Sequence, residues 1–350
     1  MAFYDGTKLL SLKDLDGNTP EIYISTSNRS AGKTTYFNKW VVNKWMKKDE
    51  KFCLLYRWKY EIMDVADKFF SEIKRLFFPE WEMTEKYNSD AGFTYLYLRH
   101  ETWEEPKCCG YAISINTSDQ LKKYSHLLAD TYRMLFDEFQ TETGAYAPKE
   151  IIKFNSIHTS IARGNGKQVR YVPVIMISNP ISILNPYYTA LGITERIAED
   201  TKFMRGHGWV LEQGYNESSA KAQSESAFNK AFSNNAYLQY SAQGKYLLDN
   251  SAFIEKVDGK FLYLCTLKYN DKHYAVKEYT EKGILYCDDK PDMSFPIKFA
   301  VDTESHEINH VMLKRNSLTV SNMRNIFEAG SFRFKNVECK DVILKMISYY

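Results

Sequence analysis

The sequence predicts an α/β protein in which a domain built on a parallel sheet is followed by a small α+β domain. Strands alternate with helices between residues 21 and 178, as they do in parallel sheets covered on both faces. A Gly-Lys-Thr turn separates the first strand from the first helix, which is the usual place for a ligand in such a sheet. From residue 253 onward the pattern changes to short strands followed by helices.

Composition excludes several classes of protein. The chain has 350 residues, of which 44% are hydrophobic and 26% charged, so we expect two ordered domains. The net charge of +2 lacks the excess of a bulk nucleic-acid binder, so any DNA must be held by a few placed residues. The six cysteines form no C-x-x-C pair, which favours buried free thiols over a zinc ribbon. Short apolar runs and the absence of a signal sequence indicate a soluble, intracellular protein without membrane contact.

The elements of the first domain follow from hydrophobic spacing. Apolar residues at helical intervals predict a helix over 36–48, and Pro79 ends the next one. Short β-branched and aromatic runs predict the strands. We expect strands at 21–26, 51–57, 93–99, 111–116, 132–139 and 169–178, and helices at 36–48, 60–78, 119–128 and 148–162.

The amino-acid composition changes after residue 203. Several glycines and the Ser-, Ala-, Asn- and Gln-rich stretch 218–235 suggest a helical linker over 205–248. The domains expected are therefore 1–204 and 249–350, and the turn Asp258-Gly259 suggests a hairpin. In the second domain we expect strands at 253–257, 261–269, 273–279 and 283–287, and helices at 316–327 and 339–348.

The segment after the first strand matches the phosphate-binding pattern G-x-x-x-x-G-K-[ST] at all positions except the first, where Ser27 replaces glycine. Such a loop directs backbone amides and a helix N-terminus at phosphate oxygens. Lys33 would neutralise the β and γ phosphates of ATP, and the Thr34 hydroxyl would bind Mg²⁺. The alternative is an accidental Gly-Lys-Thr in a surface loop. The predicted nucleotide-binding residues are Ser27, Asn28, Arg29, Ser30, Ala31, Gly32, Lys33, Thr34 and Thr35.

A second motif supplies the acids that a phosphate loop needs. The strand 132–139 carries Asp137, which would hold Mg²⁺ through water, and Glu138, which would polarise the attacking water as general base. The long gap between the two motifs leaves room for an extra strand, as in P-loop ATPases with an additional catalytic glutamate. A solvated strand end is the alternative.

Two further residues complete the predicted catalytic set. Asn179, at the end of the next strand, is placed to touch the γ-phosphate or water, although an Asn-Pro turn explains it equally simply. In ring ATPases a neighbouring subunit often inserts an arginine into the site. Arg163 is the first candidate and Arg170 the second, against the alternative of a plain surface arginine.

A rival motif lies in the second domain. Residues 306–310 match H-E-x-x-H, the zinc metalloprotease signature, with Glu328 as a conceivable third ligand. The stretch 302–310 is polar except for Ile308, however, whereas a metal-binding helix should pack into a core. An exposed polar helix or turn is therefore favoured.

The motifs together resemble the DNA-packaging (encapsidation) ATPases of small short-tailed phages with protein-primed genomes. The resemblance rests on residues 27–34, 55–59, 135–139 and 177–188, is strong over 22–190, and is thin over the last hundred residues. It implies a homopentameric ring that docks on the procapsid portal in the host cytoplasm, hydrolyses ATP with Mg²⁺ and drives double-stranded DNA inward. A structural RNA between motor and portal stays open.

The resemblance also implies a ribonuclease-H-like C-terminal domain that has lost nuclease activity. Its acids, Asp258, Asp288, Asp289 and Asp302, form no recognisable two-metal set. For DNA contacts we expect Lys59, Lys122 and Lys123, since one lysine repeated around a ring makes a basic collar that reads phosphates. The alternative functions are another ring-shaped DNA translocase or helicase and, less favoured, a zinc protease.

Overall fold

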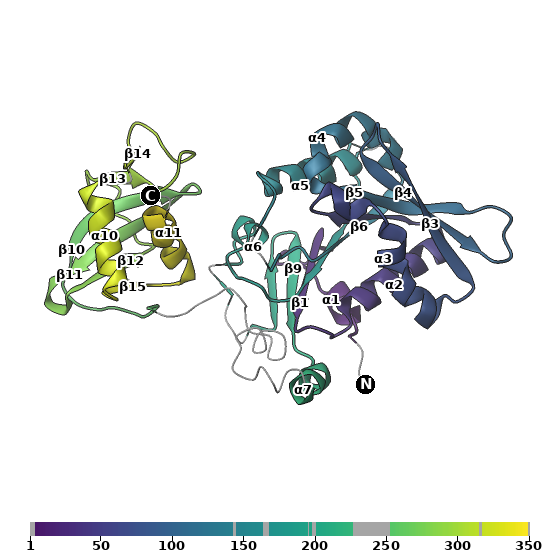
Figure 1. Cartoon of the computed structure of the whole chain (residues 1–350), viewed down its shortest axis with the longest axis horizontal. Helices are drawn as coiled ribbons and strands as arrows, with labels where there is room; N and C mark the ends of the chain where they lie inside the picture. The colour runs from purple at the N-terminus through teal and green to yellow at the C-terminus, as the bar shows by residue number, and fades with distance from the viewer. Residues whose placement is uncertain are drawn as a thin grey trace. The chain divides into compact units, whose positions relative to one another are not determined.

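The computed structural model describes residues 4–142, 145–163, 168–194, 196–197, 201–226, 253–314 and 317–348. It divides into two compact units, residues 1–248 and 249–350 (Figure 1). Among the described helices, none is both long and apolar enough to cross a membrane. Five of the six free cysteines are buried, and Cys108 is half-buried.

The N-terminal unit is organised by a nine-stranded sheet in the order β3-β4-β5-β2-β6-β7-β1-β9-β8. All pairs from β5 to β9 in this order are parallel, while β3, β4 and β8 add antiparallel edges. The central strands are buried along nearly their whole length, as a parallel sheet covered on both faces requires. The strands are β1 (Ile22–Ser27), β2 (Lys51–Tyr56), β3 (Trp81–Asn88), β4 (Phe93–His100), β5 (Lys107–Ser114), β6 (Thr131–Asp137), β7 (Val174–Ser178), β8 (Phe203–Gly206) and β9 (Trp209–Gly214).

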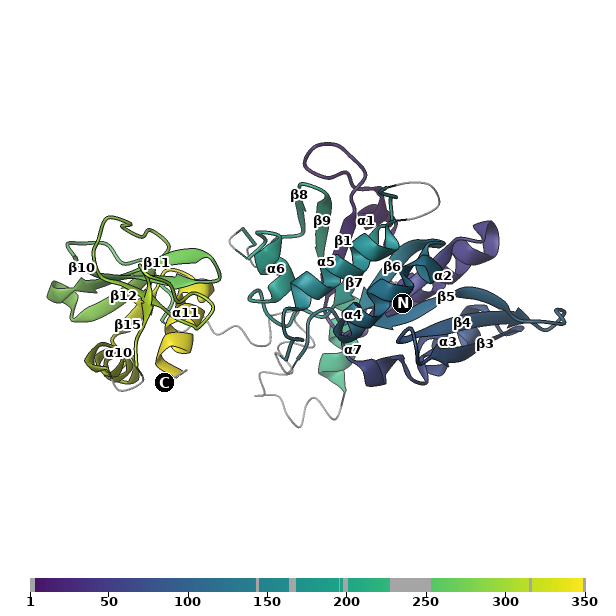
Figure 2. The same ribbon diagram turned by 90° about the horizontal axis from the view of Figure 1, so that it is seen from above.

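Helices cover both faces of this sheet (Figure 2). One core cluster joins Phe37 and Val41 of α2 and Phe69 of α3 to the sheet, and another joins Phe154 of α5 and Tyr188 of α6 to the opposite face. The unit's helices are α1 (Thr7–Ser11), α2 (Lys33–Lys48), α3 (Val65–Phe77), α4 (Ser118–Leu121), α5 (Glu150–Ile161), α6 (Pro186–Ala190) and α7 (Glu217–Glu225), with 3-10 turns η1 (Lys59–Ile62), η2 (Ile115–Thr117) and η3 (Lys122–Leu128).

The expected linker over 205–248 is wrong at its start, because residues 205–214 belong to the sheet. β8 and β9 form a hairpin, and β9 pairs in parallel with β1. The glycines that suggested a spacer have local causes: a Cβ at Gly206 would lie 2.1 Å from the Trp209 ring, and Gly208 has a φ of +76°. The rest of the predicted linker from residue 227 lies outside the described residues.

The C-terminal unit is a mixed six-stranded sheet, β14-β13-β10-β11-β12-β15, packed on two helices, so the predicted small α+β domain is confirmed. β10, β11 and β12 are antiparallel neighbours, and β13, β14 and β15 join in parallel. Its elements are β10 (Leu262–Tyr269), β11 (Lys272–Tyr279), η4 (Thr280–Lys282), β12 (Ile284–Asp288), β13 (Lys298–Ala300), β14 (Val311–Met312), α10 (Leu318–Glu328), β15 (Phe332–Phe334) and α11 (Val337–Ser348).

The hairpin expected at Asp258-Gly259 is misplaced. The β10–β11 hairpin turns at Asn270-Asp271, whose φ values of +49° and +58° fit a two-residue turn with both residues left-handed. The run 253–257 forms no strand and contributes only an isolated bridge between Ile254 and Phe334.

Candidate functional site

The phosphate-loop motif forms the turn between β1 and α2. Ser30 and Gly32 have positive φ values of 61° and 92°, and α2 begins at Lys33 with Gly32 as its N-cap. The first amides of this 16-residue helix are the kind of anion site that a helix N-terminus provides. The side chain of Asn28 ties the loop to the main chain of Asn216, which follows β9, with bonds of 3.1 and 2.9 Å.

Ser27 stands where the motif has a glycine, and its side chain accepts a hydrogen bond from Lys33. The Lys33 ammonium donates to the Ser27 hydroxyl at 2.7 Å and to the Ser27 carbonyl at 3.0 Å. The lysine is thus folded back over the loop, with its charge already held by oxygen acceptors. Burial lowers the pKa of Lys33 to about 8, and the charges of Asp137 and Glu212 act in the opposite direction.

The two predicted acids lie at the same edge of the sheet as the loop. Asp137 ends β6, and β7, which follows β6 in the chain, lies between β6 and β1 in the sheet. The gap in the sequence between the two motifs holds β2 to β5. Burial and the neighbouring Glu138 charge raise the pKa of Asp137 to about 6, while a hydrogen bond from Thr34 and the Lys33 charge lower it. Asp137 is therefore linked to Thr34 by a hydrogen bond and to Lys33 through its charge.

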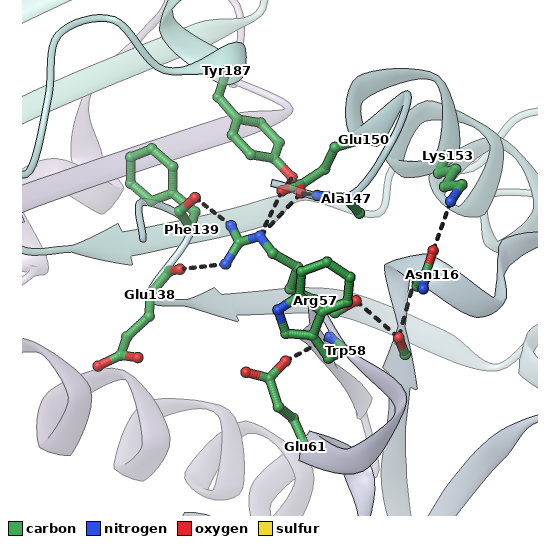
Figure 3. A network of polar contacts seen from close by, with 11 residues as sticks. Arg57, Trp58, Glu61, Asn116, Glu138, Phe139, Ala147, Glu150, Lys153 and Tyr187 are labelled. Atoms are coloured by element: carbon green, nitrogen blue, oxygen red, sulfur yellow. Dashed lines mark hydrogen bonds and ion pairs between the residues drawn. The ribbon is translucent and has the colours of Figure 1, made fainter. Parts of the chain in front are cut away.

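Glu138 adopts an unusual backbone conformation, with a φ of +54°, and its side chain is exposed. Its amide donates to an Asp137 carboxylate oxygen at 2.9 Å. Its own carboxylate points away from the polar network around Arg57 (Figure 3). A non-glycine residue in the left-handed region stores strain, which surrounding contacts must hold in place.

Arg57 at the end of β2 provides those contacts. Its guanidinium donates to the Glu138 carbonyl at 3.4 Å and to the Phe139 carbonyl at 2.7 Å. It forms a buried ion pair with Glu150 of α5, with N–O distances of 3.0 and 3.1 Å. Glu150 also accepts from the Tyr187 hydroxyl at 2.8 Å, so α5 and α6 are tied to the same point (Figure 3).

Sequence reasoning assigned no role to this network, although Arg57 stood in one of the motifs that carried the resemblance. A signal was present, because a charge directly after the apolar strand 52–56 falls at the carboxyl edge of the sheet. Glu150, 93 residues away, could not be recognised as its partner without the packing of α5.

Arg29 and Thr34 of the loop, both acids and Arg57 line one cleft of about 570 Å³. Asn179, half-buried at the end of β7, also lines it, as predicted, and so do Gln140 and Arg29, the latter in an ion pair with Glu142. The other predicted loop residues, Lys33 among them, are not part of this lining, and the Thr35 hydroxyl donates to Glu72 of α3 at 3.1 Å.

The predicted arginine and lysines lie elsewhere. Arg163 is exposed just after α5, at the opposite end of that helix from Glu150. Arg170, the second candidate, donates to the Thr131 and Ile161 carbonyls. The three lysines expected to contact DNA lie in different surroundings. Lys59 lies in η1 beside the cleft residue Trp58, Lys122 of η3 pairs with Asp119 at 3.0 Å, and Lys123 is exposed.

The rival zinc motif does not form a metal-binding helix. Residues 306–310 make a tight turn in which Glu307 and His310 form an isolated bridge, so the two histidines do not share a helical face. The His310 ring contacts the Glu307 carboxylate at 2.8 Å, and His306 accepts from the Met312 amide at 3.0 Å. In the described part of the chain no three His, Cys, Asp or Glu residues cluster as a metal site.

Comparison with known proteins agrees with the resemblance seen in the motifs. The model of the Podovirus DNA encapsidation protein (Gp16) family matches residues 2–349. The DNA packaging protein of Bacillus phage phi29 is 21% identical over 350 residues, covering 98% of this chain and 96% of the relative. That of Bacillus phage B103 is 21% identical over 314 residues, covering 88% and 90%. The structure of the bacteriophage Phi-29 viral genome packaging motor assembly has a TM-score of 0.70 at 19% identity and covers 100% of this chain and 98% of its own.

Proposed function

We propose that this chain, which belongs to the Podovirus DNA encapsidation protein (Gp16) family, is the ATP-hydrolysing motor that moves double-stranded viral DNA into a preformed procapsid. Membership makes it a DNA-packaging protein. The observation that supports hydrolysis is the meeting of the Lys33 loop with Asp137 and Glu138 at one edge of the parallel sheet.

The cleft residues divide the chemistry among them. The loop amides and Lys33 would hold the β and γ phosphates of ATP. Thr34 and Asp137 fit Mg²⁺, because a hydroxyl and a carboxylate already share a hydrogen bond there. The ion would neutralise phosphate charge. Glu138, whose carboxylate is free of the Arg57 network (Figure 3), would accept the proton of the attacking water. Asn179 would orient that water or the γ-phosphate.

A ring arrangement gives Arg163 its proposed role. α5 has 12 residues, so its two ends are about 18 Å apart, and Arg163 lies beyond the end remote from Glu150 and the chain's own cleft. Such an exposed arginine suits insertion into the site of a neighbouring copy. We propose a homopentameric ring, transiently docked at the procapsid portal in the host cytoplasm, with a structural RNA as a further candidate partner.

Lys59, Lys122 and Lys123 are the proposed DNA contacts. All three lie on exposed connections between strands, and the Lys122–Asp119 pair is exposed enough to be exchanged for a phosphate contact at little cost. Replacing the three lysines by alanine should lower translocation and the salt dependence of DNA binding, while basal ATP hydrolysis persists. Unchanged packaging by the triple variant would remove this assignment.

The C-terminal unit, residues 249–350, is proposed to have no nuclease activity. Lys277 and Lys335 occupy the carboxylates of Asp288 and Asp289, which leaves these acids poorly placed to bind metal. Cutting of plasmid DNA by the pure protein with Mg²⁺ or Mn²⁺ would contradict the proposal.

ATP hydrolysis by the full chain, with and without DNA and portal-bearing procapsids, tests the main proposal. We expect hydrolysis that Lys33→Ala abolishes, together with DNA uptake that requires the procapsid. Lys39→Ala, on an outer position of the same helix, is the matched control and should keep the rate. Translocation on free DNA without a portal would favour a different ring translocase or helicase, and absence of hydrolysis would overturn the motor assignment.

A further inference from the structure

Gln140 is a buried polar residue of the cleft to which the chemistry above gives no role. It follows Glu138 by two residues, is 2% exposed and lines the cleft. Its side-chain oxygen accepts from the amides of Ile181 and Ser182 at 3.0 and 2.9 Å. One glutamine therefore connects the segment after β6 to the segment after β7.

These bonds also settle which atom of the side-chain amide is the acceptor and which is left as the donor. Two backbone N–H groups converge on one atom, and only the carbonyl oxygen can accept from both. The Nε2 group is buried and has no hydrogen-bond partner among the residues that the structure describes. A buried donor without a partner is costly, and such groups in native proteins usually meet a ligand or water.

The neighbours of Gln140 are held rigidly. Arg57 binds the Glu138 and Phe139 carbonyls, and the Phe139 amide donates to Ile177 of β7 at 3.4 Å. Gln140 thus cannot drift from the cleft without breaking its own bonds to Ile181 and Ser182. The unpartnered Nε2 is therefore a fixed donor on a residue that lines the same cleft as Asp137 and Glu138.

We infer that Gln140 is a positioning residue that reads the terminal phosphate of the bound nucleotide: Nε2 donates to the γ-phosphate or to its attacking water, while Oε1 holds the segment that begins at Asn179. This inference rests on the proposed ATP site and adds a sensing role to it. Loss of the γ-phosphate removes a partner of Nε2 and loosens the grip of Gln140 on residues 181 and 182.

The segment held by Gln140 leads directly into α6. The Asn185 side chain caps that helix by accepting from the Tyr188 amide at 2.9 Å, and it donates to the Ser182 carbonyl at 2.8 Å. Tyr187 of α6 then reaches Glu150. A change at Gln140 therefore reaches α6 through consecutive hydrogen bonds, which supplies a route from phosphate state to helix position.

Two variants of Gln140 distinguish a contact with the phosphate from a purely structural bridge between the two loops. Gln140→Glu keeps an acceptor for both amides but has no Nε2 donor and adds a negative charge, and Gln140→Met removes bridge and donor without adding charge. The readout is the dissociation constant for ADP and for a non-hydrolysable ATP analogue, both with Mg²⁺, together with kcat and KM. Each variant should weaken the analogue about tenfold relative to ADP, because one hydrogen bond to a charged group is lost.

Gln120→Met is the matched control. Gln120 also bridges main-chain groups, donating to the Ser89 and Asp90 carbonyls at 2.8 Å, but it does not line the cleft. It should leave the ratio of the two dissociation constants unchanged. An unchanged ratio in both Gln140 variants, or equal weakening of ADP and analogue, would overturn the inference while the ATP site stands. A chain that binds neither nucleotide would overturn the proposed function as well.

Discussion

Two buried strands of this chain end in a pair of neighbouring acids, and the two pairs differ in whether lysines bind their carboxylates. Asp137 and Glu138 follow β6, whereas Asp288 and Asp289 follow β12 of the C-terminal unit. Lys277 on the adjacent strand reaches Asp288 at 2.6 Å, and Lys335 pairs with Asp289. A pair of strand-end acids is therefore a candidate site only where no lysine already satisfies its carboxylates.

At the first pair, the nearby Lys33 ammonium binds Ser27 and makes no ion pair with the acids. Lys33 donates to Ser27, so Asp137 feels its charge without being neutralised by a direct bond. The pKa of Asp137 is accordingly raised by burial and by Glu138. The N-terminal unit keeps its acids available for a ligand, and the C-terminal unit uses its acids to stabilise the sheet.

The largest expected effect is a loss of ATP hydrolysis when Glu138, the second acid of the first pair, is changed. Glu138→Gln keeps shape but cannot accept a proton, so kcat for ATP should fall about 10²- to 10⁴-fold while nucleotide binding persists. Steady-state hydrolysis and nucleotide titration measure the two quantities. Asp289→Asn, the equivalent change at the second pair, should leave hydrolysis within about twofold, and equal rates for Glu138→Gln and the unaltered protein would remove the general-base assignment.

The next effect concerns the buried ion pair of the N-terminal unit. Arg57→Met should cost about 4 kcal/mol of unfolding free energy, since it leaves the Glu150 carboxylate buried without its counter-charge. It should also lower kcat, because the Glu138 and Phe139 carbonyls lose their donor. Urea unfolding and the ATPase assay check both parts, and Arg57→Met combined with Glu150→Met should recover stability without recovering kcat.

A smaller loss is expected at the corresponding pair of the C-terminal unit. Asp288→Asn should destabilise it by about 2 kcal/mol, because Lys277 is then buried against an amide in place of a carboxylate. Hydrogen exchange of peptides spanning β11 and β12 in the full chain would report the change. ATP hydrolysis without DNA should stay unaltered, and protection as strong as in the unaltered chain would show that this pair contributes no stability.

Much of the fold was predictable because burial leaves a local mark on the sequence. The central strands are largely apolar runs, and the Gly32-Lys33-Thr34 turn identifies the edge of the sheet at which the candidate site lies. β3 was not predicted, since its residues alternate between half-buried and exposed, with charges at Glu82 and Lys86. β8 and β9 were missed because the glycines of their turn resemble those of a linker.

The site was predictable where chemistry and chain position coincide, and not where partners come from distant elements. Lys33, Thr34, Asp137 and Asn179 each stand at a strand end or helix start that the sequence identifies. The bond from Gln140 to residues 181 and 182 depends on the spacing of two loops, and the capture of Asp288 by Lys277 depends on sheet register. Neither relation has a sequence pattern.

The smallest expected effect is on the free energy of unfolding, and it has opposite signs for Asp137→Asn and Asp288→Asn. Asp137 has a pKa of about 6 in the fold against an ordinary value of 3.8, so its charge opposes folding above pH 6. Asp137→Asn should therefore stabilise the nucleotide-free protein by about 1 kcal/mol at pH 8, a value reduced because the side chain is partly open to solvent.

The gain should shrink as pH falls from 6 towards 4, because the folded protein takes up the proton first, and it should vanish below pH 3.8, where the unfolded chain is protonated as well. Urea unfolding at pH 8, 6 and 4 measures it, with Asp288→Asn as the matched control that destabilises at pH 8. If Asp137→Asn also destabilised at pH 8, Asp137 would be a satisfied structural carboxylate like Asp288, and the contrast between the two units would fail. Stabilisation together with loss of hydrolysis would instead show that the N-terminal unit retains this carboxylate for its ligand, at a cost in stability.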